Sequence, residues 1–230
     1  MNVTKSVLLA LVAGSLLFTA GCSFDLNNPN ADEYDVQIIG DSIYDYSGDI
    51  QEVLQDLSGK MYKDRSVSGE KIAGILTQYD RAIGNTPSLK TVLADGGGND
   101  IHLGSADCDS DPLTQGCIDT IDYVADRMEV LLEDMYLDGV DDCVWLGYYY
   151  MTGSEAETKE AIDYAYSLYP AIFSDASFNV YGSGGAYLID SRGDIEPNHI
   201  KSDDIHPTYA GSEILANLIW NVMVAEDTYR

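Results

Sequence analysis

The sequence predicts an α/β fold in which helices cover both faces of a mostly parallel β-sheet. Short apolar segments alternate along the chain with longer segments in which apolar residues recur every three or four positions. Consecutive parallel strands need a long crossover connection, and a helix is its usual form. The 230 residues are enough for one such domain.

Four segments are predicted to be strands of this sheet: residues 34–40, 91–94, 143–149 and 186–190. The first contains Val36, Ile38 and Ile39, an apolar run that suits a strand buried on both faces. We expect the periodic segments between them to form the helical layers.

Five segments are predicted to be helices: residues 48–57, 71–83, 118–135, 159–168 and 210–224. Spacings of three and four put the apolar residues of each on one face. The faces expected to be buried are Ile72, Ile75, Leu76 and Tyr79; Ile121, Val124, Met128, Leu131, Leu132 and Met135; and Ile214, Leu215, Leu218, Ile219 and Val222.

The chain is strongly acidic, with 39 Asp and Glu against 12 Lys and Arg and a net charge of −27. Such a charge repels phosphate backbones, so we expect no nucleic-acid partner. Anionic membrane surfaces and polyanionic substrates are disfavoured for the same reason. We expect the acidic side chains to keep the protein surface solvated. We also expect the protein to be monomeric.

The first 33 residues have the pattern of a targeting segment rather than of a folded domain. Lys5 precedes an apolar run at 7–18, which is short for a membrane span. Residues 19–22, Thr-Ala-Gly-Cys, resemble a bacterial lipobox. We therefore expect a signal peptide at 1–21, a lipidated Cys22 with a polar tether at 22–33, and a folded domain at 34–230.

This segment predicts export, to a bacterial outer membrane or cell surface as a lipoprotein. The chain would touch a membrane only through its N-terminal lipid. The alternative is an ordinary secretory signal with an incidental Cys22, which would leave the protein periplasmic or secreted.

The three other cysteines are predicted to divide into a pair and a free thiol. Cys108 and Cys117 bracket a short loop that can close as a disulfide in an oxidising compartment. Cys143 lies in a predicted strand and is expected to be a buried thiol. Pairing of Cys143 with one of the other two remains an alternative.

Three polar motifs follow predicted strands, and such positions meet at one edge of a parallel sheet. Gly40-Asp41-Ser42 follows the first strand, and Gly96-Gly97-Gly98-Asn99-Asp100 follows the second. Asp203-Asp204-Ile205-His206-Pro207 lies between the last strand and the last helix. The sheet alone therefore predicts that these residues approach one another.

The residue types in these motifs are those of a serine hydrolase. A serine hydroxyl needs a base to remove its proton, and the chain has only three histidines. His206 is the best candidate, because Asp203 lies three residues earlier and can orient the imidazole. Asp204 is a competitor for that role. His102 either lines the site or lies on the surface, and His199 is expected in a loop.

Together with Ser68-Gly69, these segments resemble the SGNH (GDSL-type) esterase and lipase superfamily, named for the residue types Ser, Gly, Asn and His. The resemblance spans residues 36–211 and implies a flavodoxin-like three-layer sandwich. It implies that Ser42, Asp203 and His206 are catalytic, and that no metal or organic cofactor is needed.

The same resemblance implies an oxyanion hole formed by the backbone N–H groups of Ser42 and Gly69 and the side-chain amide of Asn99. We expect glycine at 69 because a close backbone approach would leave no room for a Cβ atom. Gly74 is the alternative donor.

Other motifs are absent or incomplete. The sequence contains no Gly-x-Ser-x-Gly, no Walker A motif and no Gly-x-Gly-x-x-Gly. Asp107, Asp109 and Asp111 alternate as in a calcium loop, but Pro112 and Ile118 replace the expected Gly and Glu. We expect a solvated acidic loop there.

The tyrosine run at 148–150 is expected to end a strand beneath a helix. The alternative is that it borders an acyl pocket.

These observations predict a carboxylic ester hydrolase that works through an acyl-enzyme on a small-molecule or acylated-glycan ester. The alternative is a non-catalytic surface lipoprotein that binds carbohydrate or lipid in the same crevice.

Overall fold

The computed structural model describes residues 34–182 and 184–230. The predicted signal peptide, lipobox and tether, including Cys22, lie outside the described residues. Within those residues, no helix is long and apolar enough to cross a membrane.

Five parallel strands form one sheet in the order β2-β1-β3-β4-β5. They are β1 Val36–Ile39, β2 Lys63–Asp64, β3 Thr91–Ala94, β4 Asp142–Leu146 and β5 Ala186–Ile189. This is the flavodoxin-like order, in which chain direction along the sheet reverses at β1 and β3. The predicted α/β sandwich is therefore confirmed.

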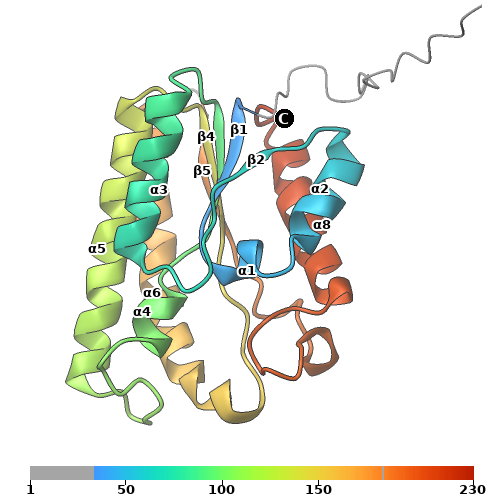
Figure 1. Cartoon of the computed structure of the whole chain (residues 1–230). Helices are drawn as coiled ribbons and strands as arrows, with labels where there is room; N and C mark the ends of the chain where they lie inside the picture. Colours follow the sequence, from blue (N-terminus) through green and yellow to red (C-terminus); the bar gives the residue numbers. More distant parts are fainter. Residues whose placement is uncertain (1–33, 183) are drawn as a thin grey trace, which may run out of the picture.

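Helices cover both faces of the sheet, with α3, α5 and α6 on one side and α2 and α8 on the other (Figure 1). The helices are α1 Ser42–Asp45, α2 Asp49–Ser58, α3 Ile72–Asn85, α4 Gly98–His102, α5 Gln115–Leu137, α6 Lys159–Asp175, α7 Ser177–Tyr181 and α8 Tyr209–Ala225. Two 3₁₀ segments are η1 Gly153–Thr158 and η2 Pro197–His199. Each face of the sheet has its own apolar core.

Two predicted boundaries are wrong, and one predicted face is confirmed only in part. Strand β4 ends at Leu146, so the tyrosine run at 148–150 follows the strand. Helix α6 continues to Asp175 through Pro170, because Ile172 and Phe173 beyond the proline are buried in the core. In α8, Leu215 and Ile219 are buried as expected, and Ile214, Leu218 and Val222 are half-buried against the same core. Ala216 and Met223, which were not expected there, are buried as well.

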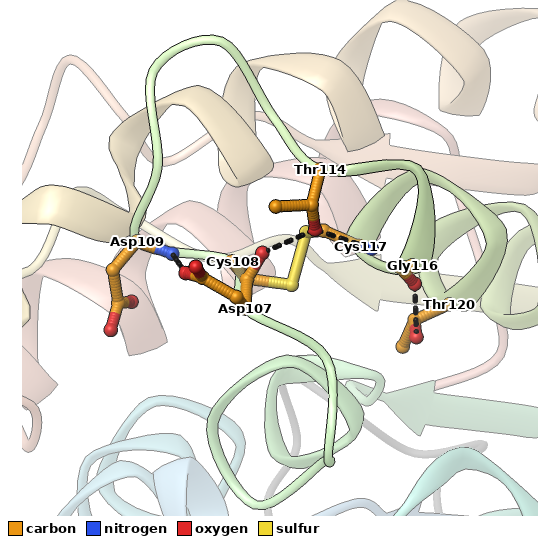
Figure 2. The surroundings of a disulfide bond; sticks show 7 residues. All are labelled: Asp107, Cys108, Asp109, Thr114, Gly116, Cys117 and Thr120. Carbon is orange, nitrogen blue, oxygen red and sulfur yellow. Dashed lines mark hydrogen bonds between the residues drawn. A yellow bond between two sulfur atoms is a disulfide. The ribbon is translucent and has the colours of Figure 1, made fainter.

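Cys108 and Cys117 are joined in a disulfide that closes the loop before α5 (Figure 2). Their Cα atoms lie 5.1 Å apart. Thr114 stabilises the same turn: its hydroxyl donates to the carbonyl of Asp107 at 2.7 Å and accepts from the N–H of Cys117 at 3.2 Å. Cys143 is a free, buried thiol, and burial raises its pKa.

Non-reducing peptide mapping is expected to recover Cys108 and Cys117 in one cross-linked peptide pair. In the chain-entropy description, a loop this short stabilises the fold by roughly 2–3 kcal/mol. Reduction is therefore expected to lower Tm, and the variant Cys143→Ala should show the same loss on reduction. Two free thiols at 108 and 117 in the unreduced, purified protein would contradict the pairing.

Candidate active site

Residues from every motif border one cavity of about 350 Å³ at the carboxyl end of the sheet. Ser42 enters it from the first turn of α1, Asn99 from α4, and His206 from the segment between β5 and α8. Most of the wall is apolar. The lining residues are Asp41, Ser42, Ile43, Tyr46, Ser68, Gly69, Gly98, Asn99, His102, Leu103, Tyr148, Met151, Ile205 and His206.

Asp203 holds the His206 ring. Its Oδ2 lies 3.0 Å from Nδ1 of His206, and its Oδ1 accepts from the backbone N–H groups of Ile205 at 3.1 Å and His206 at 2.9 Å. An ionised carboxylate can only accept, so Nδ1 carries the proton and the lone pair of Nε2 is available to a proton donor. This is the orientation that a general base needs.

Asp204, the competing candidate, has a different role. Its φ angle of 67° places it in the left-handed region, and its carboxylate turns away from the histidine. It accepts from the hydroxyl of Thr152 at 3.2 Å and from the N–H of Ser154 at 3.3 Å. Asp204 therefore ties η1 to the histidine segment rather than orienting His206.

The environment of Asp203 favours its charged form. Burial acts to raise the pKa of Asp203, but hydrogen bonds from the backbone of His206, from its ring and from the backbone of Ile205 outweigh burial. The pKa of Asp203 consequently lies below its ordinary value.

The His206 ring is fixed next to α1. Tyr46, four residues after Ser42, stacks on it with ring centroids 4.3 Å apart and planes inclined by 13°. The hydroxyl of Tyr149 donates to the carbonyl of Ile205 at 2.6 Å. The Nε2 atom of His206 is buried and makes no hydrogen bond to any described residue. A bond from the Ser42 hydroxyl is thus not formed in this state, as is common in unliganded active sites.

Two backbone donors are free for an oxyanion. Within the described residues, neither the N–H of Ser42 nor that of Gly69 donates a hydrogen bond. Ser68 anchors the second donor, because its N–H and hydroxyl both donate to Asp45, at 2.8 and 2.6 Å.

The backbone conformation gives a further reason for glycine at position 69. A Cβ atom built there meets nothing within 4 Å. Among the described residues the requirement therefore comes from a φ angle of +80°, which side-chain-bearing residues rarely adopt. Gly74, the alternative donor, lies inside α3 and does not line the cavity.

Asn99 lines the cavity, but both hydrogens of its amide already face acceptors. Nδ2 donates to Oδ2 of Asp41 at 3.1 Å and to the carbonyl of Glu70 at 2.9 Å. If the amide oxygen and nitrogen of Asn99 were exchanged, the amide oxygen would face two other acceptor oxygens. The assignment with Nδ2 at this position therefore holds. Donation to an oxyanion therefore requires Asn99 to share or release one of these bonds.

Asp41 connects the nucleophile to this amide. One carboxylate oxygen caps α1 by accepting from the N–H of Ile43 at 3.1 Å. The other accepts from Asn99 and from the hydroxyl of Tyr148 at 2.5 Å. Burial raises the pKa of Asp41. Tyr148 thus borders the cavity, and the expectation that the tyrosine run merely ends a strand is wrong at this position.

The glycines before Asn99 make room for these neighbours. Gly97 has a φ angle of +98°, and a Cβ atom there would lie 2.5 Å from Val124. A Cβ atom on Gly98 would lie 2.7 Å from the Tyr148 ring. Larger residues would therefore displace either α5 or Tyr148.

A second buried carboxyl, Asp95, lies behind Asp41 and was not foreseen from the sequence. Its Oδ1 accepts from the backbone N–H of Asp41 at 2.7 Å, and its Oδ2 is buried without a partner among the described residues. Burial, and then the charge of Asp41, raise the pKa of Asp95 well above its ordinary value. The sequence feature that could have identified Asp95 is its position directly after β3 and next to the motif glycines.

Asp95→Asn is expected to stabilise the protein at pH 8 and to lose that advantage toward pH 4. Between the ordinary pKa and the raised one, the folded chain holds a proton that the unfolded chain releases, so wild-type stability falls as pH rises. The amide of the variant does not titrate, so it carries no such dependence. Paired thermal melts at the two pH values measure this. A difference in Tm that does not change with pH would contradict a neutral, buried Asp95.

The two remaining histidines are separated by the structure. His102 lines the cavity, whereas His199 lies in η2, where its Nδ1 accepts from the N–H of Glu196 at 3.1 Å. In the part of the chain that the structure describes, no group of three or more His, Cys, Asp or Glu side chains could hold a metal ion, and this includes the loop of Asp107, Asp109 and Asp111.

Sequence comparison matches no family model and no curated protein. Solved structures do match. TesA superposes with a TM-score of 0.60, covering 82% of this chain and 97% of its own, at 17% identity. A GDSL-like lipase from Bacteroides thetaiotaomicron gives 0.60, covering 84% and 89%, at 18% identity. The acetylxylan esterase Axe2 from Geobacillus stearothermophilus gives 0.59, covering 84% and 94%, at 15% identity.

At these identities the similarity establishes the fold. The chain has the α/β fold of SGNH hydrolases, as its motifs predicted.

Proposed function

We propose that this protein is a serine hydrolase that cleaves carboxylic esters through an acyl-enzyme. The observation that carries the proposal is the convergence of three features on one cavity. These are a serine at a helix start, a histidine held by a carboxylate with its second nitrogen unbonded, and two free backbone N–H groups. Each feature alone is common, but together they supply a nucleophile, a base and an oxyanion site.

In the proposed reaction, the Ser42 oxygen attacks the ester carbonyl carbon while Nε2 of His206 takes the hydroxyl proton. The carbonyl oxygen becomes an oxyanion, which the N–H groups of Ser42 and Gly69 stabilise, with Asn99 as a third donor once it shares a bond. Collapse expels the alcohol, which takes the proton from His206. Water then attacks the acyl-enzyme by the same steps in reverse and releases the acid.

A non-catalytic binding role is the second candidate, and two observations favour it. The hydrogen bond from Ser42 to His206 is not formed, and both amide hydrogens of Asn99 are in use. Turnover of 4-nitrophenyl butyrate by the purified protein separates the two functions. A binding protein would show no more turnover than a matched buffer.

The cavity wall favours an uncharged ester with an apolar acyl part. Ile43, Leu103, Met151 and Ile205 contribute apolar surface, and the net charge of −27 opposes anionic substrates. TesA, a lipase and an acetylxylan esterase share the fold, so the fold leaves the substrate open. A panel of acyl lengths and leaving groups, including acylated glycans, would rank the substrates of this protein.

We also propose that the protein is exported and lipidated at Cys22, on the strength of the apolar run and the lipobox-like residues. Mass spectrometry of the mature N-terminus tests this. A free amine on any residue after Cys22 would refute lipidation.

The activity is expected to fall in acid as one group, the His206 imidazole, gains a proton. Only neutral imidazole can accept the Ser42 proton, and acid protonates an imidazole. Asp203 keeps its charge through this range, because its pKa lies below the ordinary value. We expect log kcat/KM to approach a slope of one as pH falls below neutral. A profile that stays flat to about pH 4 would contradict His206 as the base.

A further inference from the structure

A second histidine–carboxylate pair borders the same cavity. Nδ1 of His102, at the end of α4, lies 3.1 Å from Oε2 of Glu155 in η1. The pair is largely shielded, since the side chains are 13% and 31% exposed. The contact has nearly the same length as that between Asp203 and His206, which is 3.0 Å.

The two pairs are not interchangeable as the base for Ser42. The ring of His206 stacks on Tyr46, which follows Ser42 by one helical turn, whereas His102 makes no such ring contact with any described residue of α1. Among the described residues, Nε2 of His102 has no hydrogen-bond partner. His102 is therefore a polar group of the cavity that the proposed reaction does not use.

Glu155 determines what His102 can recognise. An ionised carboxylate accepts only, so it holds the ring in the tautomer with the proton on Nδ1. The lone pair of Nε2 is then the free acceptor of a ring that lines the cavity. Leu103 and Met151, which also line the cavity, offer no competing donor. A fixed acceptor in an apolar wall favours a ligand that brings a hydrogen-bond donor and disfavours one that does not.

His102 and the proposed third oxyanion donor, Asn99, lie on the same helix and line the same cavity. Asn99 and His102 are three residues apart on α4, and residues at this spacing share a helix face. The negative charge of Glu155 would repel an anionic group, and such a group has no hydrogen to donate to Nε2. A neutral hydroxyl is therefore the best fit.

We propose that His102, positioned by Glu155, binds a hydroxyl group of the ester substrate and makes this enzyme selective for hydroxylated esters. The proposal rests on the proposed ester hydrolysis. The hydroxyl could belong to the acyl part, as in a hydroxyacyl ester, or to the alcohol part, as in a polyol or sugar ester. The chemistry of recognition is the same for both.

Three esters distinguish these sources: propyl butyrate, propyl 3-hydroxybutyrate and glycerol 1-monobutyrate. The wild type is expected to prefer one hydroxylated ester over propyl butyrate by roughly 3- to 10-fold in kcat/KM, the factor that one neutral hydrogen bond supplies. His102→Leu keeps a side chain in the wall but removes the acceptor, so this ratio should fall to about one. The ester whose advantage disappears identifies which part carries the hydroxyl.

Glu155→Gln provides a second variant in which His102 remains but its tautomer and orientation are no longer fixed, and the ratio should fall in the same direction. Two matched controls should leave the ratio unchanged. These are Glu157→Gln, an exposed residue of the same 3₁₀ segment, and His199→Leu, outside the cavity.

Turnover of all three esters with no hydroxyl preference in the wild type would overturn the role of His102. A preference that survives His102→Leu would overturn it equally. No turnover of any ester by the wild type would contradict ester hydrolysis itself, and this inference would fall with it.

Discussion

If the proposed mechanism holds, Ser42→Ala is expected to reduce ester turnover to background, a loss of roughly 10⁴-fold or more, the size of effect known for serine triads. The variant lacks the only atom that can form the acyl-enzyme. Binding of an unreactive substrate analogue should survive, since the hydroxyl makes one contact among many. Steady-state turnover and calorimetric binding of the analogue measure the two effects separately.

Ser47→Ala is the matched control, because Ser47 is exposed, lies five residues further along and borders no part of the cavity. It should keep wild-type turnover. Wild-type turnover in Ser42→Ala would contradict the mechanism. Loss of analogue binding together with turnover would point to misfolding or to a binding role for the hydroxyl, and a thermal melt decides between them.

Asp203→Asn is expected to lower kcat by roughly 10³- to 10⁴-fold. The amide can donate to Nδ1, which favours the tautomer with its proton on Nε2, and that tautomer cannot accept from Ser42. KM should change little, because Asp203 does not line the cavity.

Asp204→Asn separates this effect from a general loss of carboxylate. Asn tolerates the left-handed conformation at this position, and Asp204 contacts η1 rather than His206. We expect this variant to retain most activity. If the two variants lose activity equally, the assignment of Asp203 as the orienting residue is wrong.

Much of the fold could be predicted because the apolar residues that form the sequence pattern are the ones whose side chains are buried. The strand at Val36–Ile39 and the helix at Gln115–Leu137 follow from apolar runs and from spacings of three and four. The strand Lys63–Asp64 was missed because two polar residues at a sheet edge have no such signal. The helix predicted at 159–168 continues through Pro170, because the packing of the residues beyond it outweighs one lost backbone hydrogen bond.

The sequence also predicted which motifs meet, because the carboxyl ends of parallel strands share one edge. It could not predict how their side chains pair. The bonds from Tyr148 and Asn99 to Asp41 join residues that are 107 and 58 positions apart. The pairing of His102 with Glu155 likewise depends on how η1 packs, which no spacing in the sequence records.

Covalent labelling of the wild-type protein with a fluorophosphonate, followed by identification of the modified residue, tests the central claim most directly. Phosphonylation requires an activated nucleophile and an oxyanion site at the same place. The proposed mechanism predicts a single label on Ser42, and no label in Ser42→Ala. An unlabelled wild-type protein, or a label on any other residue, would contradict it.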